Sequence, residues 1–241
     1  MKLASVTLFI AMCSACAQSP PAFEVASIKP NHSGSGRSST NGTKGQLRME
    51  NLSLKRLIQR AYDVRDFSLS GPDWLDTEHF DILAKPPEGA PPEKFTLMLQ
   101  TLLTERFKLA VHREKKTMAG YALVVAKKGA KLEAAEETKS SSTNTSRGRL
   151  EARGVSMSTL ADALAHQVDR PVEDLTGLTG SYNFKLEWTP DAAASEKSSD
   201  VALGPTLFTA LQEQLGLQLR AQKVTIEVLV VDSAERVPTE N

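Results

Sequence analysis

One pattern of residues occurs twice in this chain, and this repetition limits the folds available to it. Residues 47–54 read Leu-Arg-Met-Glu-Asn-Leu-Ser-Leu, and residues 150–157 read Leu-Glu-Ala-Arg-Gly-Val-Ser-Met. Each stretch predicts a short strand, a turn residue, and then a helix whose N-cap is Ser53 or Ser156. Because the same strand-to-helix turn occurs twice, we expect two copies of one α+β unit.

The residues after each stretch predict the same further elements in the same order. Apolar residues at three- and four-residue spacing indicate a helix, and alternating apolar residues after a glycine-containing turn indicate a strand. A second helix and two closing strands complete a β-α-β-α-β-β unit. We therefore predict an α+β fold, a tandem duplication in which mixed or antiparallel sheets carry helices on one face. The supporting positions are Leu54, Leu57, Ile58, Ala61, Phe80, Ile82, Ala84, Leu99, Leu103 and Phe107 in the first unit and Met157, Leu160, Leu164, Tyr182, Phe184, Leu186, Leu207, Leu211 and Leu215 in the second.

Changes in composition along the chain predict the domain boundaries. Two stretches rich in Ser, Thr, Asn and Gly lack large apolar residues, which is typical of loops and linkers. The predicted order is a signal peptide (1–17), an N-terminal strand and mobile loop (18–46), the first unit (47–137), a Ser/Thr-rich linker (138–149) and the second unit (150–241).

The first residues are typical of an export signal. A lysine precedes an apolar run of signal-peptide length, and small residues follow it. Two processing sites fit. Ala15-Cys16-Ala17 matches a signal-peptidase site, whereas Ser14-Ala15-Cys16 resembles a lipobox that would leave Cys16 lipidated. We expect a periplasmic or secreted protein, or a lipoprotein that meets the membrane only through Cys16.

Composition excludes several classes of function. The chain has 29 Lys and Arg residues and 29 Asp and Glu residues, so its formal net charge is zero. A neutral chain with few aromatic residues gives no reason to expect a nucleic-acid partner, and we expect none. Both cysteines, Cys13 and Cys16, lie in the leader. We therefore expect neither a disulfide nor a thiol nucleophile in the mature chain.

Several stretches together resemble a soil-associated family of unknown function that is expanded in Acidobacteria. The resemblance covers nearly the whole mature chain and implies export. Similar segments occur attached to membrane metallopeptidases of the antibiotic-sensor type, which implies a sensing or binding role, but this chain lacks their His-Glu-x-x-His motif. The stretches that resemble this family are residues 23–30 (Phe-Glu-Val-Ala-Ser-Ile-Lys-Pro), 71–76 (Gly-Pro-Asp-Trp-Leu-Asp), 80–82 (Phe-Asp-Ile), 105–109 (Glu-Arg-Phe-Lys-Leu), 121–125 (Tyr-Ala-Leu-Val-Val) and 177–182 (Gly-Leu-Thr-Gly-Ser-Tyr).

Motifs for common catalytic chemistry are missing from the sequence. No serine has the flanking glycines of a nucleophile elbow, and no lysine follows a serine by three positions. The four histidines form neither an i, i+4 pair nor a cluster with cysteines, so we expect no metal and no cofactor. We expect no catalytic residue on this basis.

Two groups of residues are candidates for ligand contact. Asp73 and Asp76 flank Trp74 in a turn, and an aromatic ring beside two acids is common in sugar-binding sites. A basic stretch includes Arg106 and Arg113, with His112 beside it, which suits an acidic ligand.

Three functions follow as hypotheses. The first is an exported, non-catalytic binding or sensing module of the bacterial cell envelope, whose partner is an envelope protein or a small ligand. The second is an extracytoplasmic hydrolase that acts on glycan or peptide through Asp73, Asp76 or His112. The third is a structural envelope-assembly domain, because the strand followed by Leu-Ser-Leu resembles the short N-terminal modules of secretins and TonB-dependent receptors.

Overall fold

Two units share the chain, and each is assembled from separate stretches of it. The computed structural model describes residues 20–43, 45–135, 141–190 and 204–239. Unit 1 takes its residues from Met1–Asp63, Pro72–Ala110 and Ser233–Asn241, and unit 2 takes its residues from Val64–Gly71 and Val111–Asp232. These limits differ from the predicted boundaries because short segments pair with strands far along the chain. The predicted leader, with Cys16, lies outside the described residues.

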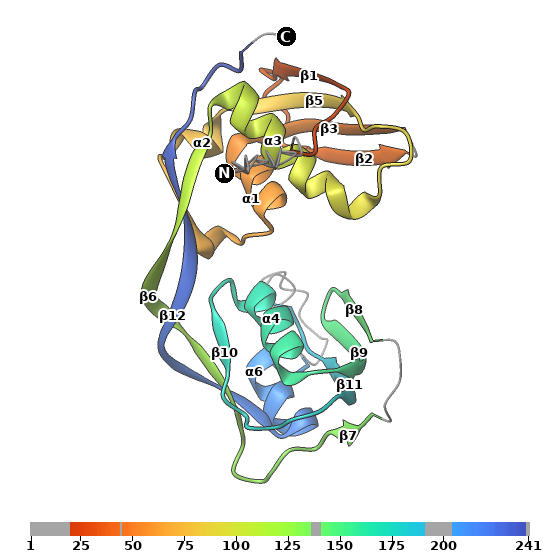
Figure 1. The fold of residues 1–241 in the computed structure, drawn as a ribbon. Helices are drawn as coiled ribbons and strands as arrows, with labels where there is room; N and C mark the ends of the chain where they lie inside the picture. Colours follow the sequence, from red (N-terminus) through yellow and green to blue (C-terminus); the bar gives the residue numbers. More distant parts are fainter. Residues whose placement is uncertain (1–19, 44, 136–140, 191–203, 240–241) are drawn as a thin grey trace, which may run out of the picture. The chain divides into compact units, whose positions relative to one another are not determined.

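Unit 1 contains an antiparallel sheet of order β1-β5-β3-β2 whose helices pack on one face (Figure 1). Strand alternation directs Met49 of β3 and Phe80 and Ile82 of β5 into the core, where all three are buried. The elements are β1 (Val25–Pro30), β2 (Ser39–Thr43), β3 (Gln46–Ser53), α1 (Leu54–Tyr62), α2 (Trp74–Thr77), β5 (His79–Lys85), a 3-10 turn (Pro92–Lys94) and α3 (Phe95–Phe107).

Helices α1 and α3 close the core of unit 1. The apolar positions predicted for both helices are buried, including Ile58 in α1 and Leu103 in α3. The Phe107 ring meets the Phe80 ring edge to face, with centroids 4.9 Å apart and planes at 76°. Such aromatic pairs add about 1 kcal/mol to the stabilisation from buried area.

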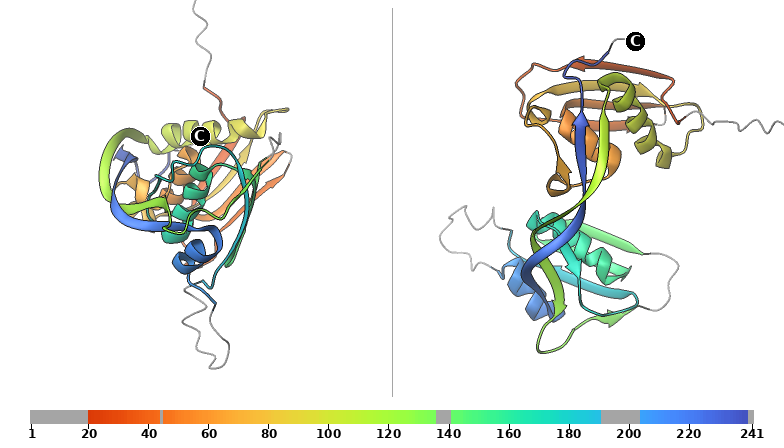
Figure 2. Two further views of the ribbon diagram at one scale, coloured as in Figure 1. Left: turned by 90° about the horizontal axis from the view of Figure 1, so that it is seen from below. Right: turned by 60° about the vertical axis from the view of Figure 1, so that its left-hand side comes forward.

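Unit 2 contains two long strands, β6 (Ala110–Val125) and β12 (Leu217–Ser233), which lie side by side (Figure 2). Each pairs with one short parallel strand. Leu69 of β4 lies opposite Leu229 of β12, and Val172 of β10 lies opposite Tyr121 of β6. The resulting order is β10-β6-β12-β4, with β4 at Leu69–Ser70 after a 3-10 turn (Asp66–Ser68) and with β10 at Val172–Asp174.

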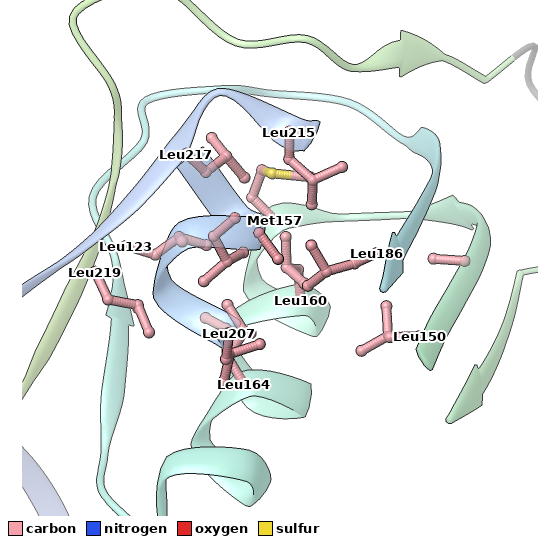
Figure 3. Close-up of a cluster of buried hydrophobic side chains, with 14 of the residues drawn as sticks. Leu123, Leu150, Met157, Leu160, Leu164, Leu186, Leu207, Leu215, Leu217 and Leu219 are labelled. Atoms are coloured by element: carbon pink, nitrogen blue, oxygen red, sulfur yellow. The ribbon is translucent and has the colours of Figure 1, made fainter. Parts of the chain in front are cut away.

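A second, antiparallel sheet of order β7-β11-β9-β8 completes unit 2. Its core joins Leu150 and Leu186 from the sheet with Met157 and Leu160 from α4 and Leu215 (Figure 3). The elements are β7 (Glu133–Ala134), β8 (Ser142–Ser146), β9 (Arg149–Val155), α4 (Met157–Val168), β11 (Tyr182–Glu187), α6 (Leu207–Ala210) and a π-helical turn (Leu211–Leu215). The predicted α+β class and the largely antiparallel pairing are therefore confirmed.

The two strand-to-helix turns have the same backbone geometry. Asn51 and Gly154 both have left-handed backbones, with φ of 52° and 59°. The backbone N–H of Asn51 donates to Asp81 Oδ1 at 2.9 Å, and that of Gly154 donates to Asn183 Oδ1 at 2.9 Å. Each pair of strands also shifts register at this point. Both turns are thus held by a side chain from the neighbouring strand.

Serine caps then begin both helices as predicted. The Ser53 hydroxyl accepts from Arg56 N at 3.3 Å, and the Ser156 hydroxyl accepts from Thr159 N at 3.2 Å. Each bond satisfies one of the backbone donors left free at a helix start.

The prediction of loops at two Ser/Thr-rich stretches was wrong in part. Ser39–Thr43 forms β2 against β3, and Ser142–Ser146 forms β8 against β9. Both strands lie at a sheet edge, where pairing depends on backbone groups and needs no buried side chain. The two stretches begin alike, with Ser-Ser-Thr-Asn at 38–41 and 141–144. Residues 138–140 of the predicted linker lie outside the described part.

Candidate functional site

The predicted turn residues Asp73, Trp74 and Asp76 lie in and beside α2 of unit 1. Lys55 Nζ contacts Asp76 Oδ2 at 2.9 Å. The guanidinium of Arg236 lies over the Trp74 ring, 5.2 Å from its centroid. The chain itself therefore occupies Asp76 and one face of the Trp74 ring, two of the three side chains of this predicted ligand contact.

Arg106, at the end of α3, is also engaged by the chain. Its Nε donates to the Thr239 carbonyl at 2.5 Å, and Thr239 N donates to the Arg106 carbonyl at 2.8 Å. Arg106 lines a cavity of about 400 Å³ with Glu105, Leu102 and residues 22–26. The guanidinium thus ties α3 to residue 239, and the Thr239 N–H satisfies a carbonyl at the end of the helix, which together indicate a structural role.

His112 and Arg113 lie on β6 in unit 2. His112 Nδ1 is 2.7 Å from Asp232 Oδ1, and Arg113 Nη1 is 2.6 Å from Glu227 Oε1. All four side chains are about half exposed, and they join β6 to β12. Exposed pairs of this kind contribute about 0–1 kcal/mol each. Of the six residues predicted to contact ligand, four belong to unit 1 and these two belong to unit 2.

A cavity of about 410 Å³ opens beside a lysine-rich turn of unit 2, and we take it as the candidate site. Its size lies within the range of about 300–1,000 Å³ that is usual for small-molecule sites. One wall is the turn formed by residues 126–131, and the other is the exposed face of α6 and the π-turn. The lining residues are Lys128, Lys131, Phe208, Thr209, Gln212, Glu213, Gln218 and Leu219.

Backbone hydrogen bonds fix this lysine-rich turn. Gly129 N donates to the Ala126 carbonyl at 2.9 Å, Ala126 N to the Gly216 carbonyl at 2.9 Å, and Lys131 N to the Leu215 carbonyl at 2.8 Å. A Cβ on Gly216 would lie 2.0 Å from the Gly129 carbonyl oxygen, so only glycine permits this approach. This wall of the cavity is therefore preformed.

The π-turn Leu211–Leu215 forms the opposite wall. Such turns are rare, and they occur frequently at functional sites. The turn leaves backbone carbonyls without helical partners, and Lys131 Nζ takes up that of Glu213 at 2.7 Å. Lys131 thus links the lysine-rich turn to the π-turn through both its backbone and its side chain.

Phe208 supplies the apolar surface of the cavity. Its side chain is 44% exposed although its neighbours Leu207 and Leu211 are buried. The Tyr121 ring supports it edge to face, with centroids 5.6 Å apart. An aromatic ring held in place but left uncovered is suited to contact a ligand.

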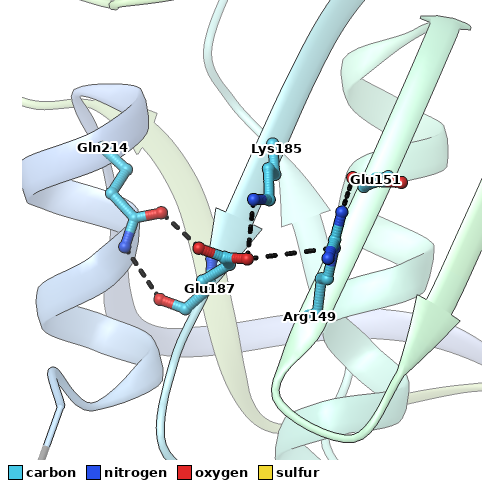
Figure 4. A network of polar contacts seen from close by, with 5 residues as sticks. All are labelled: Arg149, Glu151, Lys185, Glu187 and Gln214. Carbon is cyan, nitrogen blue, oxygen red and sulfur yellow. Dashed lines mark hydrogen bonds and ion pairs between the residues drawn. The ribbon is translucent and has the colours of Figure 1, made fainter.

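The open face of the second sheet of unit 2 carries a separate polar network (Figure 4). Arg149 pairs with Glu151, and Lys185 Nζ lies 2.7 Å from Glu187 Oε1. The hydrogen bond from Arg149 lowers the pKa of Glu151, and the same bond raises the pKa of Arg149. The Gln214 amide bonds both backbone groups of Glu187, at 3.0 and 2.8 Å. These charges satisfy one another, which indicates that they stabilise the surface.

Within the described ranges, no group of three or more His, Cys, Asp or Glu side chains is placed to hold a metal ion. None of the helices described is long and apolar enough to cross a membrane.

Lys128 and Phe208 escaped prediction, although each had a signal. Phe208 is the apolar residue that falls outside the buried stripe of Leu207, Leu211 and Leu215. Lys128 belongs to the run Lys-Lys-Gly-Ala-Lys at 127–131, where a glycine among lysines indicates a built turn. Neither signal identifies the partner wall, which lies about 80 positions away.

A model of the family described as a protein of unknown function (DUF3738) matches residues 55–234. No curated protein matches the chain, and no solved structure matches it.

Proposed function

The chain belongs to the family of proteins of unknown function DUF3738, and from the geometry of its cavity we propose that it is a non-catalytic binding or sensing module. The single observation that carries this proposal is the cavity of about 410 Å³ between the lysine-rich turn and the π-turn. Its walls are fixed by backbone hydrogen bonds, so little ordering entropy opposes binding.

The proposed place of action is the bacterial cell envelope. The charged first residues, the short apolar run and the small residues after it support export. The partner is then a small ligand or an envelope protein, in the periplasm or outside the cell. Lipid on Cys16 would anchor the chain to a membrane.

The contacts of Asp76 and His112 support a non-catalytic role. Asp76 is paired with Lys55, and His112 is paired with Asp232 at the solvent-exposed surface of two strands. A general acid or base works best inside a site that shields it from water.

Native mass spectrometry of the chain from its host's envelope tests this proposal. We expect a mature start at Gln18 or a lipid on Cys16, together with a stoichiometric additional mass or a co-purified protein. A bare chain that captures no partner from an envelope extract would contradict the proposal.

A hydrolase is the second candidate, because His112 Nδ1 lies 2.7 Å from Asp232 Oδ1, as an oriented catalytic histidine does. Its test is alanine replacement at Asp73, Asp76 and His112. A hydrolytic activity that survives all three replacements would exclude this version.

A further inference from the structure

Lys128 and Arg236 occupy matching positions in the sequence but have different environments. Each is the third residue after the end of a long strand, β6 for Lys128 and β12 for Arg236. Arg236 is held over the Trp74 ring at 5.2 Å. Across residues 20–43, 45–135, 141–190 and 204–239, no hydrogen bond or ion pair engages Lys128, which lines the open cavity. Its ammonium group is thus available to an anion.

The turn that carries Lys128 has a fixed backbone, which places the root of this side chain at the cavity. Gly129 has a left-handed backbone with φ of 82°, and its N–H closes the turn onto Ala126. Lys131, the other lysine of the lining, is already used by the Glu213 carbonyl. The bond to a neutral carbonyl leaves the charge of Lys131 in place, so the two lysines and Glu213 give the lining an excess of one positive charge.

The lining also limits the charge of the ligand. Because the lining has an excess of one positive charge, a monoanion matches it better than a multiply charged anion such as a phosphate ester. A single carboxylate that faces Lys128 is repelled less by Glu213 than a dianion would be. The exposed Phe208 ring offers an apolar surface, and the amides of Gln212 and Gln218 offer hydrogen bonds to polar substituents.

We propose that this cavity binds an organic monoanion, a carboxylate carried on an apolar group. Lys128 faces the carboxylate, and Phe208 contacts the apolar group. This assignment rests on the proposed binding function and adds the chemical class of the ligand to it.

Calorimetric titration of the full chain with 2-naphthoate and with its neutral amide, 2-naphthamide, tests the assignment. We expect the acid to bind more tightly than the amide, and increasing salt to reduce this difference. Lys128→Gln should weaken naphthoate about fivefold, as expected for one solvent-accessible ion pair, and leave the amide unchanged. Phe208→Ala should weaken both probes.

Lys127→Gln is the matched control, because Lys127 is adjacent and exposed but does not line the cavity. Equal binding of acid and amide, no binding of either, or equal effects of the variants at 127 and 128 would overturn the assignment. A small molecule retained in native mass spectrometry would in those cases leave the binding function standing. If the native chain carries no additional mass and neither naphthoate nor naphthamide binds, both the ligand class and the binding function would be contradicted.

Discussion

The segments β2-β3-α1 and β8-β9-α4 share a backbone path but hold it with different side chains. A left-handed residue precedes each helix cap, and it is Asn51 in one segment and Gly154 in the other. On the open sheet face, Arg48 and Glu50 occupy positions where the second segment has Glu151 and Arg153, so the order of charges is reversed. The backbone thus depends on a few conformational positions, whereas the exposed side chains vary. The shared geometry supports the predicted tandem duplication, which stays a prediction.

The same comparison extends to the ends of the second helices. Lys108 ends α3 with φ of 50°, and Gly216 ends the π-turn with φ of 64°. A segment following a long strand covers each end, since Glu235 N donates to the Phe107 carbonyl and Lys131 N donates to the Leu215 carbonyl. The end of α3 is covered by a segment that brings no lysine to a cavity. The end of the π-turn is covered by the lysine-rich turn and lies beside the candidate site. The candidate site therefore lies where the two segments differ and not where they are alike.

The largest effect is expected at these helix ends. Gly216→Ala should reduce the free energy of unfolding by about 3 kcal/mol, because it combines left-handed strain with a collision against the Gly129 carbonyl. Lys108→Gly should instead raise stability by about 0.5 kcal/mol, because it relieves left-handed strain. Denaturant unfolding measures both. Equal effects at the two positions would contradict the comparison.

The next effect is expected at the side chains that hold the strand-to-helix turns. Asp81→Ala should cost about 2 kcal/mol, because its carboxylate accepts from both Asn51 N and Asn31 Nδ2. Asn183→Ala should cost about 1 kcal/mol, because it removes one neutral hydrogen bond to Gly154 N. Chemical denaturation of the two variants decides the order. A larger loss at Asn183 would show that the turns are held differently.

The helix caps are expected to behave alike. Ser53→Ala and Ser156→Ala should each reduce the free energy of unfolding by about 1 kcal/mol, since each removes one bond to a helix-start N–H. Serine-to-glycine variants are the controls and should cost less, because glycine is itself tolerated at this position. A loss confined to one cap would argue against equivalence of the segments.

The smallest effect concerns pH. Bonds from Arg48 and Ser39 lower the pKa of Glu50, and the bond from Arg149 lowers that of Glu151. A carboxylate with a depressed folded-state pKa stabilises the fold above the ordinary value of 4.5, and this contribution is lost as pH falls through the folded-state pKa. Glu50→Gln and Glu151→Gln should each lower the Tm slightly at neutral pH and leave it unchanged in acid. A variant whose Tm differs equally at both pH values would refute this linkage.

Much of the fold could be predicted because burial leaves a local pattern. Helix and strand positions such as Leu57, Phe80 and Leu160 repeat at regular spacing and are buried. Strands β2 and β8 leave no apolar pattern, since backbone pairing and polar surface contacts hold them at the edge. The parallel pairing of β4 with β12 joins residues far apart in the sequence, so no local signal predicts it.

The cavity that we take as the candidate site could not be predicted for a related reason, and the six residues expected to contact ligand stay a prediction. Asp73, Trp74 and Arg106 have residue types that suit ligands, but the folded chain engages Trp74 and Arg106 itself. The cavity instead depends on Lys128 and Phe208, whose proximity arises from tertiary packing. A composition argument cannot distinguish a charge that the protein has satisfied from one that it has left available.

The coverage of α3 by residues 235–239 has a consequence for the order of synthesis. Glu235 and Thr239 supply hydrogen bonds to the carbonyls of Phe107 and Arg106, yet both are made after all of unit 2. The sheet of unit 1 is translated early, whereas the end of α3 lacks these hydrogen bonds until residues 235–239 have been made. A chain that stops before residue 235 would therefore weaken the unit that was begun first.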